Sequence, residues 1–273
     1  KIGGPADILV LPESIEQLRE VLKVVKETVV PLTLLGNGSN VLVRDKGIRG
    51  IVIKLGNMLR HFYEAEDLLV FGSGYSLALA SYKAMECGKT GMEFAVGIPG
   101  SIGGAVYMNA GAYDGEMQNI VNCVKVMDLQ GNERVLTAEE LNFGYRKTSL
   151  QNSGLIVTEV TLKMPSGNKD EIKSKMDDFS HRRISKQPLE MPSAGSMFKR
   201  PPGYFAGTLI DQAGLKGYTV GGAQISTKHA GFVVNVGGAT AADVLQLIKD
   251  VQTKIKAGVG VELQPEVLVI GEE

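Results

Sequence analysis

Residues 93–113 read EFAVGIPGSIGGAVYMNAGAY, a stretch that combines frequent glycine with very few charges. Its glycines are Gly97, Gly100, Gly103, Gly104 and Gly111. Glycine is favoured where the backbone turns with φ > 0 or comes close to another group. The stretch is too apolar for a solvated linker and too rich in glycine for an ordinary helix or strand. We therefore expect backbone that surrounds a buried, flat, partly polar ligand; a tight turn between buried elements is the alternative.

A second glycine-rich segment, LLGNGSN, occupies residues 34–40 at the end of a predicted strand. Small residues let consecutive backbone N–H groups converge on an anion, and Ser39 and Asn40 add side-chain donors. The segment is neither a Rossmann G-x-G-x-x-G nor a P-loop with its lysine. Taken alone it could equally be a hairpin turn. Two such segments at strand ends favour a dinucleotide such as FAD, with its pyrophosphate near residues 36–40.

The composition is that of a globular protein with a sizeable core. The chain has 273 residues, 44% hydrophobic and 22% charged, which suggests about two domains. A net charge of −1 argues against nucleic acid or an anionic membrane as the main partner. Two cysteines without CxxC spacing indicate a reducing compartment. Three histidines without metal-ligand spacing predict no metal site, and no apolar run reaches the ~18 residues of a membrane span.

Periodicity, capping and turn signals predict a mixture of helices and strands. Strands are expected at residues 6–11, 31–35, 48–55, 68–72, 155–164, 220–225, 232–236 and 261–270, with a hairpin over 122–136. Helices are expected after the capping boxes at Ser14 and Thr240, and over 77–87, 169–185 and 205–213. The elements do not alternate strictly, so an α+β fold is favoured over a doubly wound α/β fold. Turn residues at 165–168 predict a boundary between domains at 1–165 and 166–273.

Three positions outside the glycine-rich segments could carry chemistry. Arg146, beside Tyr145 in FGYRKTS, could clamp a carboxylate, although local sequence favours an ordinary surface arginine. Ser196 follows Gly195 in a proline-rich loop, with Lys199 and Arg200 shortly after it. Its hydroxyl could protonate a carbanion; no His or Asp lies in a triad-like neighbouring position, so a nucleophilic role is disfavoured. A purely structural loop is the alternative.

Glu266 is the third position, because it lies within an apolar predicted strand. An unpaired buried charge is costly, so such a carboxylate tends to be paired or catalytic. An edge strand with Glu266 facing water is the alternative. The segment 221–235, with Ser226, Lys228 and His229, could form a polar wall of a substrate site, although a single histidine is more often structural.

Together these motifs resemble the UDP-N-acetylenolpyruvoylglucosamine reductase family, flavoenzymes of bacterial peptidoglycan synthesis. The matching segments run in family order over nearly the whole chain: IGGPAD (2–7), GNGSN (36–40), GIPGSIGGAVYMNAGAY (97–113), FGYR (143–146), SKQP (185–188), PSAGSMFKRP (192–201), AGTLIDQAGLKG (206–217), GGAQIS (221–226), HAGFVVN (229–235) and PEVLVIG (265–271). The resemblance implies an FAD-binding domain of the vanillyl-alcohol-oxidase (PCMH) type, with lobes at about 1–56 and 57–165. A C-terminal α+β substrate-binding domain would follow. The short segment at 165–168 is similar to the shorter-loop class of the family.

The resemblance also implies a two-step reaction. NADPH reduces non-covalent FAD, and hydride then passes from the flavin N5 to the enolpyruvyl β-carbon of UDP-N-acetylglucosamine enolpyruvate. Protonation of the α-carbon gives UDP-N-acetylmuramate. Ser196 matches the family's proton donor, and Arg146 and Glu266 match residues that stabilise the enol intermediate. We expect a cytoplasmic monomer that serves cell-wall biogenesis, cell shape and cell division and acts on small molecules, without a nucleic-acid or membrane partner.

The glycine-rich segments and the family resemblance together predict the ligand-binding residues. FAD is expected to contact Gly36, Asn37, Gly38, Ser39, Asn40, Gly97, Ile98, Pro99, Gly100, Ser101, Gly103, Gly104, Asn109, Gly111 and Ala112. The substrate is expected to contact Tyr145, Arg183, Lys186, Lys199, Arg200 and His229. The alternative enzyme is an FAD-dependent oxidase or dehydrogenase of the same fold that acts on a sugar or alcohol. Many such enzymes tether flavin through His or Cys, and neither glycine-rich segment contains histidine. A nucleotide-sugar binding protein without activity is a third possibility.

Overall fold

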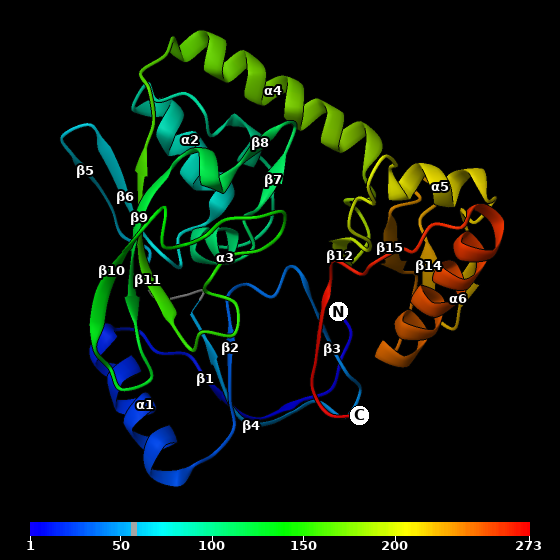
Figure 1. Cartoon of the computed structure of the whole chain (residues 1–273), viewed down its shortest axis with the longest axis horizontal. Coiled ribbons are helices and arrows are strands. Elements are labelled where there is room, and N and C mark those ends of the chain that lie inside the picture. Colours follow the sequence, from blue (N-terminus) through cyan, green and yellow to red (C-terminus); the bar gives the residue numbers. More distant parts are fainter. Residues whose placement is uncertain (56–58) are drawn as a thin grey trace. The chain divides into compact units, whose positions relative to one another are not determined.

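The computed structural model describes residues 1–55 and 59–273, and Figure 1 shows the course of the chain. The chain forms two compact units, each made from segments that are separate in sequence. The larger unit contains Ile8–Gly38 and Gly50–Arg182. The smaller unit contains Lys1–Asp7, Ser39–Arg49 and Arg183–Glu273. The turn residues at 165–168 predict a different division, into ligand-binding domains at 1–165 and 166–273. That division stays a prediction.

A five-stranded antiparallel sheet forms the centre of the larger unit (Figure 1). In spatial order its strands are β10 (Glu133–Thr137), β9 (Val121–Met127), β11 (Ile156–Lys163), β6 (Leu68–Gly72) and β5 (Phe62–Ala65). The predicted hairpin over 122–136 is confirmed by the pairing of β9 with β10. Phe71, Val124 and Val160 from this sheet are fully buried in the main core of the unit.

Helices α2 (Leu77–Glu86) and α3 (Ile102–Tyr107) add Leu77, Ala80, Ile102 and Val106 to the same core. Helix α3 corrects the expectation that residues 93–113 are too rich in glycine for a helix. Ser101 caps it, since its Oγ accepts the N–H of Gly104 at 3.3 Å. Buried apolar contacts on one face therefore outweigh the low helix propensity of its two glycines. The strands β7 (Gly111–Ala112) and β8 (Gly115–Glu116) and the 3₁₀ turns Glu93–Ala95 and Met117–Asn119 flank it.

Helix α1 (Ile15–Thr28) covers a second core of the larger unit. Its predicted cap is present, because Ser14 Oγ accepts the N–H of Gln17 at 3.2 Å. Leu18 and Leu22 on its apolar face are buried. The adjoining three-stranded sheet has the order β1 (Ala6–Val10), β4 (Ile48–Lys54) and β2 (Leu32–Leu35), with β2 and β4 parallel.

The smaller unit contains a four-stranded sheet and two helices. The sheet order is β12 (Ser193–Ser196), β15 (Phe232–Asn235), β14 (Ala223–Ile225) and β13 (Thr219–Val220). Helices α5 (Ala206–Gln212) and α6 (Ala241–Val259) share its core. Strand β16 (Leu268–Ile270) pairs in parallel with β3 (Val41–Val43). The predicted charged helix is α4 (Lys169–Lys186), whose residues from Arg183 onward belong to this unit.

Three predicted elements are wrong in extent. The strand expected at 261–270 is limited to β16, and before it only a single antiparallel bridge forms, between Pro265 and Phe198, with backbone bonds that join Gln264 to Lys199 and Glu266 to Met197. The strand expected at 220–225 is two short strands, separated by a turn at Gly221 with φ +54°. The proline-rich loop at 187–202 contains strand β12, whose partner β15 lies far along the chain.

Candidate functional site

The two glycine-rich segments predicted to bind a cofactor meet within the larger unit. A Cβ added at Gly36 would lie 3.0 Å from Ser101 Oγ, so residues 36 and 101 are immediate neighbours. Gly38 has φ +70°, and nothing lies within 4 Å of a Cβ built there. The backbone at Gly36 is therefore close to Ser101, whereas space is left beside Gly38. A flat cofactor with a diphosphate fits such a glycine cradle.

A third loop, residues 72–76, supports the cradle and was not singled out from the sequence. Its carbonyls accept bonds from the start of α3: Gly103 N–H donates to Ser73 O at 2.9 Å, and Ile102 N–H donates to Tyr75 O at 2.9 Å. Ser73 is 3% exposed, and its Oγ has no hydrogen-bond partner in the part of the chain that the structure describes. A buried hydroxyl of this kind suits a polar group of a ligand. The signal that could have identified it is GSG directly after a predicted strand.

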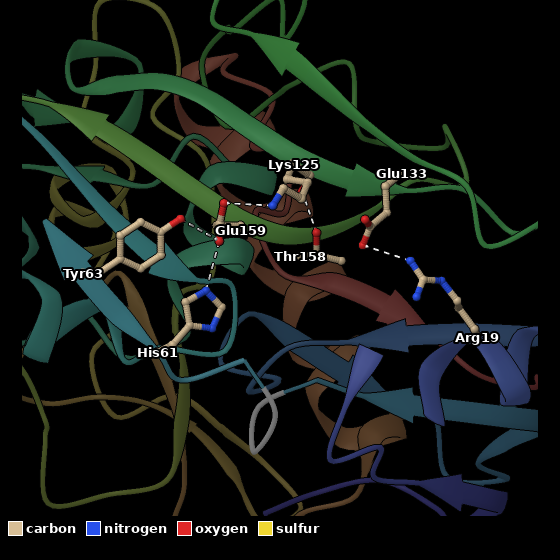
Figure 2. A network of polar contacts seen from close by, with 7 residues as sticks. All are labelled: Arg19, His61, Tyr63, Lys125, Glu133, Thr158 and Glu159. Carbon is tan, nitrogen blue, oxygen red and sulfur yellow. Dashed lines mark hydrogen bonds and ion pairs between the residues drawn. The ribbon is translucent and has the colours of Figure 1, made fainter. Parts of the chain in front are cut away.

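A bulge in β11 fixes this third loop to the sheet. The register shifts between Val157 and Glu159, and Thr158 O accepts the N–H of Ser73 at 3.0 Å. Figure 2 shows the polar contacts around this bulge. Thr158 Oγ1 donates to Lys125 O at 3.1 Å, and the Glu159 carboxylate lies 3.3 Å from Lys125 Nζ and 3.1 Å from His61 Nε2. The loop is thus attached to β11, which Thr158 and Glu159 in turn connect to Lys125 of β9 and to His61.

Arg146 lies against the glycine-rich stretch in the same unit. Its guanidinium donates to Gly111 O at 2.9 Å and to Asn109 O at 3.3 Å, and lies 4.9 Å from the ring centroid of Tyr145. Its φ is +54°, in the left-handed region. Arg146, the predicted carboxylate-binding arginine, is therefore bonded to two predicted cofactor-binding residues and is not an ordinary surface arginine.

Ser196 and Glu266 lie on adjacent segments of the smaller unit. Ser196, at the end of β12, pairs with Phe232 of β15 and is exposed. The next residue, Met197, accepts the N–H of Glu266 at 2.8 Å. Asn40 from the predicted pyrophosphate loop joins this group, because its Nδ2 donates to Glu266 O at 3.1 Å. The structure thus places the backbone segments that carry Ser196 and Glu266 next to each other.

His229 lies next to this group and is bonded through its ring to the backbone. Its Nδ1 accepts the N–H of Gly231 at 3.0 Å, and Gly231 O in turn accepts the N–H of Met197. Burial lowers the pKa of His229, and the positive charges of Lys216 and Lys186 lower it further. Because Nδ1 is an acceptor, the ring proton of the neutral form lies on Nε2.

The remaining predicted substrate residues of the smaller unit have different surroundings. Arg183 is buried, and its guanidinium donates to Gln187 Oε1 at 3.2 Å. Arg200 stacks on Phe205 with 4.0 Å between the guanidinium carbon and the ring centroid. Lys186 is exposed at the end of α4, and Lys199 is half-buried beside Gln264. The described residues contain no group of three or more side chains suited to a metal ion.

Comparisons with known proteins point to one family along the whole chain. Residues 6–137 match the family model of an FAD binding domain, and residues 187–270 match that of the C-terminal domain of UDP-N-acetylenolpyruvoylglucosamine reductase. The reductase of Clostridium perfringens (strain SM101 / Type A) is 52% identical over 273 residues, which cover 100% of this chain and 90% of that protein. The reductase of Geobacillus thermodenitrificans is 50% identical with the same coverage.

A solved structure gives the same result for the fold. The crystal structure of the reductase from Thermus caldophilus superposes with a TM-score of 0.83 at 40% identity. The match covers 98% of this chain and 93% of that one. An α+β fold with an FAD-binding domain and a C-terminal reductase domain is thereby confirmed. Among the described residues, no helix is both long and apolar enough to cross a bilayer.

Proposed function

Because the chain belongs to the UDP-N-acetylenolpyruvoylglucosamine reductase family, we propose that it reduces UDP-N-acetylglucosamine enolpyruvate to UDP-N-acetylmuramate. The reductant is NADPH and the cofactor is non-covalent FAD, and the product enters peptidoglycan precursor synthesis. The observation that carries this proposal is the match of both domains in order, in a chain whose two glycine-rich segments meet at Gly36 and Ser101.

Residues of the glycine cradle are proposed to hold FAD. Gly36, Gly38 and Ser101 provide close backbone approach and donors for the diphosphate, and the buried Ser73 hydroxyl is a further donor. When bound, FAD supplies the hydride chemistry that links NADPH oxidation to reduction of the enolpyruvyl double bond. No histidine or cysteine lies in residues 36–40 or 97–113, which is consistent with non-covalent binding.

Ser196 is proposed to protonate the α-carbon of the substrate. Hydride addition at the β-carbon leaves negative charge at the α-carbon and on the neighbouring carboxylate. A carbon acid of this kind is strongly basic when deprotonated, so even a weakly acidic hydroxyl can protonate it when it is well placed. The exposed position of Ser196 at a strand end allows solvent to restore its proton.

Arg146 and Glu266 are proposed to stabilise the charge that develops before protonation. The planar guanidinium can bind the substrate carboxylate in a bidentate manner. A protonated Glu266 could donate to the second enolate oxygen, as preorganised donors do in oxyanion sites. The backbone of Glu266 is bonded to Met197 and Asn40, which supports the proposal because Met197 directly follows Ser196.

The nucleotide part of the substrate is proposed to contact Tyr145 and the basic residues. Lys186, Arg183, Lys199 and Arg200 supply positive charge for a diphosphate. His229 contributes a neutral N–H donor rather than a charge, since its Nδ1 is already occupied by the N–H of Gly231.

An absorption spectrum tests the proposed function. Adding NADPH without oxygen should bleach the flavin band, and adding UDP-N-acetylglucosamine enolpyruvate should restore it. A flavin that bleached but did not recover with this substrate would contradict the proposal. Flavin that stayed attached after denaturation would favour the sugar or alcohol oxidase, and a colourless protein that bound UDP would favour a binding protein.

We also propose that the protein is a cytoplasmic monomer with neither a nucleic-acid nor a membrane partner. Nucleotide-activated sugars and NADPH are cytoplasmic metabolites, and the net charge of −1 offers no strong attraction to polyanions. Light scattering during size exclusion should give the mass of one chain, and fractionation should place the protein with cytoplasmic enzymes. A dimer mass or recovery with the membrane fraction would contradict this.

A further inference from the structure

Asn109 is the most completely buried polar residue of the glycine-rich stretch, with an exposed fraction of 0%. Burying a primary amide is costly unless its polar atoms form hydrogen bonds. Here Nδ2 donates to Gly144 O at 3.0 Å and to Glu116 Oε2 at 3.0 Å, and Oδ1 accepts the N–H of Gln118 at 3.0 Å. Both amide hydrogens are therefore used inside the protein.

The carbonyl of Gly144 that Asn109 binds belongs to the turn that carries Arg146. Gly144 and Lys147 exchange backbone bonds of 2.9 and 3.1 Å across this turn, and Arg146 between them has φ +54°. A non-glycine residue in this conformation persists only when surrounding contacts hold it. Asn109 holds one end of the turn, and Gln151 Nε2 holds the other by donating to Arg146 O at 3.2 Å.

The backbone of the same asparagine also contacts the arginine side chain. Asn109 O and Gly111 O accept bonds from the two terminal nitrogens of Arg146. Asn109 itself has φ +44°, which turns the chain so that its carbonyl and its side chain both serve the 144–147 turn. One residue thus contacts both the backbone turn and the guanidinium of Arg146.

From this geometry we propose that Asn109 is a positioning residue, which aligns Arg146 for the carboxylate of the substrate. It joins the stretch that binds the cofactor to the turn that binds the substrate. The inference rests on the proposed function only for the role of Arg146. It differs from the expectation that Asn109 contacts FAD directly, because its two amide hydrogens are committed to Gly144 and Glu116.

Stopped-flow measurement of the two half-reactions tests this role. Asn109→Asp keeps the shape and tolerates positive φ, but it replaces two donors by acceptors that face Gly144 O and Glu116. We expect reoxidation of the reduced enzyme by substrate to slow at least about tenfold, with a higher KM for the substrate. Flavin content and the rate of reduction by NADPH should stay within about twofold, which a general loss of structure would not allow.

Two further variants make the test specific. Asn142→Asp is the matched control, because Asn142 has φ +43° close to the same turn but is exposed. It should react as the wild type does. Should Asn109→Asp fail to fold, Asn109→Gly removes the same side-chain bonds without adding a charge and retains the carbonyl for Arg146.

A double-mutant comparison decides whether Asn109 acts through Arg146. Adding Asn109→Asp to Arg146→Ala should slow reoxidation by less than about twofold beyond Arg146→Ala alone. A further tenfold loss, or normal reoxidation in Asn109→Asp beside slow Arg146→Ala, would overturn the inference. Normal reoxidation in Arg146→Ala would instead refute the proposed role of Arg146, so the two failures can be told apart.

Discussion

Arg146 in the larger unit and Ser196 in the smaller unit are held in place by different means. Arg146 has a left-handed backbone and depends on side-chain bonds from Asn109 and Gln151. Ser196 depends on backbone pairing of β12 with β15, and the N–H of its neighbour Met197 donates to Gly231 O. The first arrangement can be disturbed by distant side chains. The second should tolerate them and respond mainly to loss of the hydroxyl itself.

The largest effect is expected for Ser196→Ala, which removes the proposed proton donor and leaves the strand intact. Reoxidation of reduced enzyme by the substrate should slow by about 10²–10⁴-fold, while reduction by NADPH is unchanged. Single-turnover absorbance measures both steps. Ser193→Ala on the same strand removes the bonds of its hydroxyl to the backbone of Gly195, and it should still change either step by less than about threefold, because backbone pairing sets the position of Ser196. If Ser193→Ala slowed reoxidation as much as Ser196→Ala, Ser196 would depend on neighbouring side chains just as Arg146 does.

Arg146→Lys is expected to slow reoxidation by about 10- to 100-fold, the loss that corresponds to one hydrogen bond to a charged group. A lysine ammonium cannot bond Asn109 O, Gly111 O and a carboxylate with the geometry of a planar guanidinium. Kinetics at varied substrate concentration would show the loss in kcat as well as in KM. A change in KM alone would indicate that Arg146 only binds the substrate.

Gly103→Ala should destabilise the protein by about 1–3 kcal/mol, because the added Cβ would lie 2.7 Å from the Cβ of the buried Ser73. Urea denaturation with and without added FAD measures this cost and its effect on cofactor retention. Gly104→Ala is the control on the same helix, since it is exposed and its nearest neighbour is Ser101 Oγ at 3.4 Å. If both changes lowered the free energy of unfolding equally, the contact of residue 103 with Ser73 would not be the cause of the loss.

The smallest effect concerns Glu93, which anchors the start of the glycine-rich stretch. Burial raises the pKa of this carboxyl, but bonds from Thr90 Oγ1 (2.6 Å) and Gly91 N–H (2.8 Å) outweigh burial and lower the pKa overall. A lowered pKa means that the stabilisation is present above the unfolded-state pKa and is lost as pH falls through the folded one. The stability gap between wild type and Glu93→Gln should therefore narrow below about pH 4. A gap of constant size in urea titrations from pH 7 to pH 3.5 would contradict this.

Local signals in the sequence predicted most of the fold correctly. The caps at Ser14 and Thr240 involve residues three positions apart, and both are present. The elements that were missed or wrong depend on distant partners. Strand β12 exists because β15 pairs with it, and helix α3 exists because its apolar face is buried. No local pattern contains that information.

In the candidate site, too, residues within local motifs were predicted, whereas contacts between residues far apart in the sequence were not. Residue types at Arg146, Ser196 and Glu266 were recognised from motifs, and their roles stay predictions. Ser73 lies in a GSG segment that could have been noticed, but the bonds of Asn109 could not be anticipated. Gly144 lies 35 positions from Asn109, so only the folded chain shows that they are bonded. A glycine-rich motif indicates that the backbone must come close to something, but not which side chains fix its position.

The parallel pair of β16 with β3 has a consequence for the order of events during synthesis. Leu268–Ile270 complete a sheet whose first strand, Val41–Val43, leaves the ribosome more than 200 residues earlier. Because the chain is synthesised at ~5–20 residues per second, β3 lacks this partner strand for on the order of 10–45 s. Unpaired strand edges attract unwanted partners. A nascent or prematurely ended chain should consequently need chaperone protection that the finished chain does not.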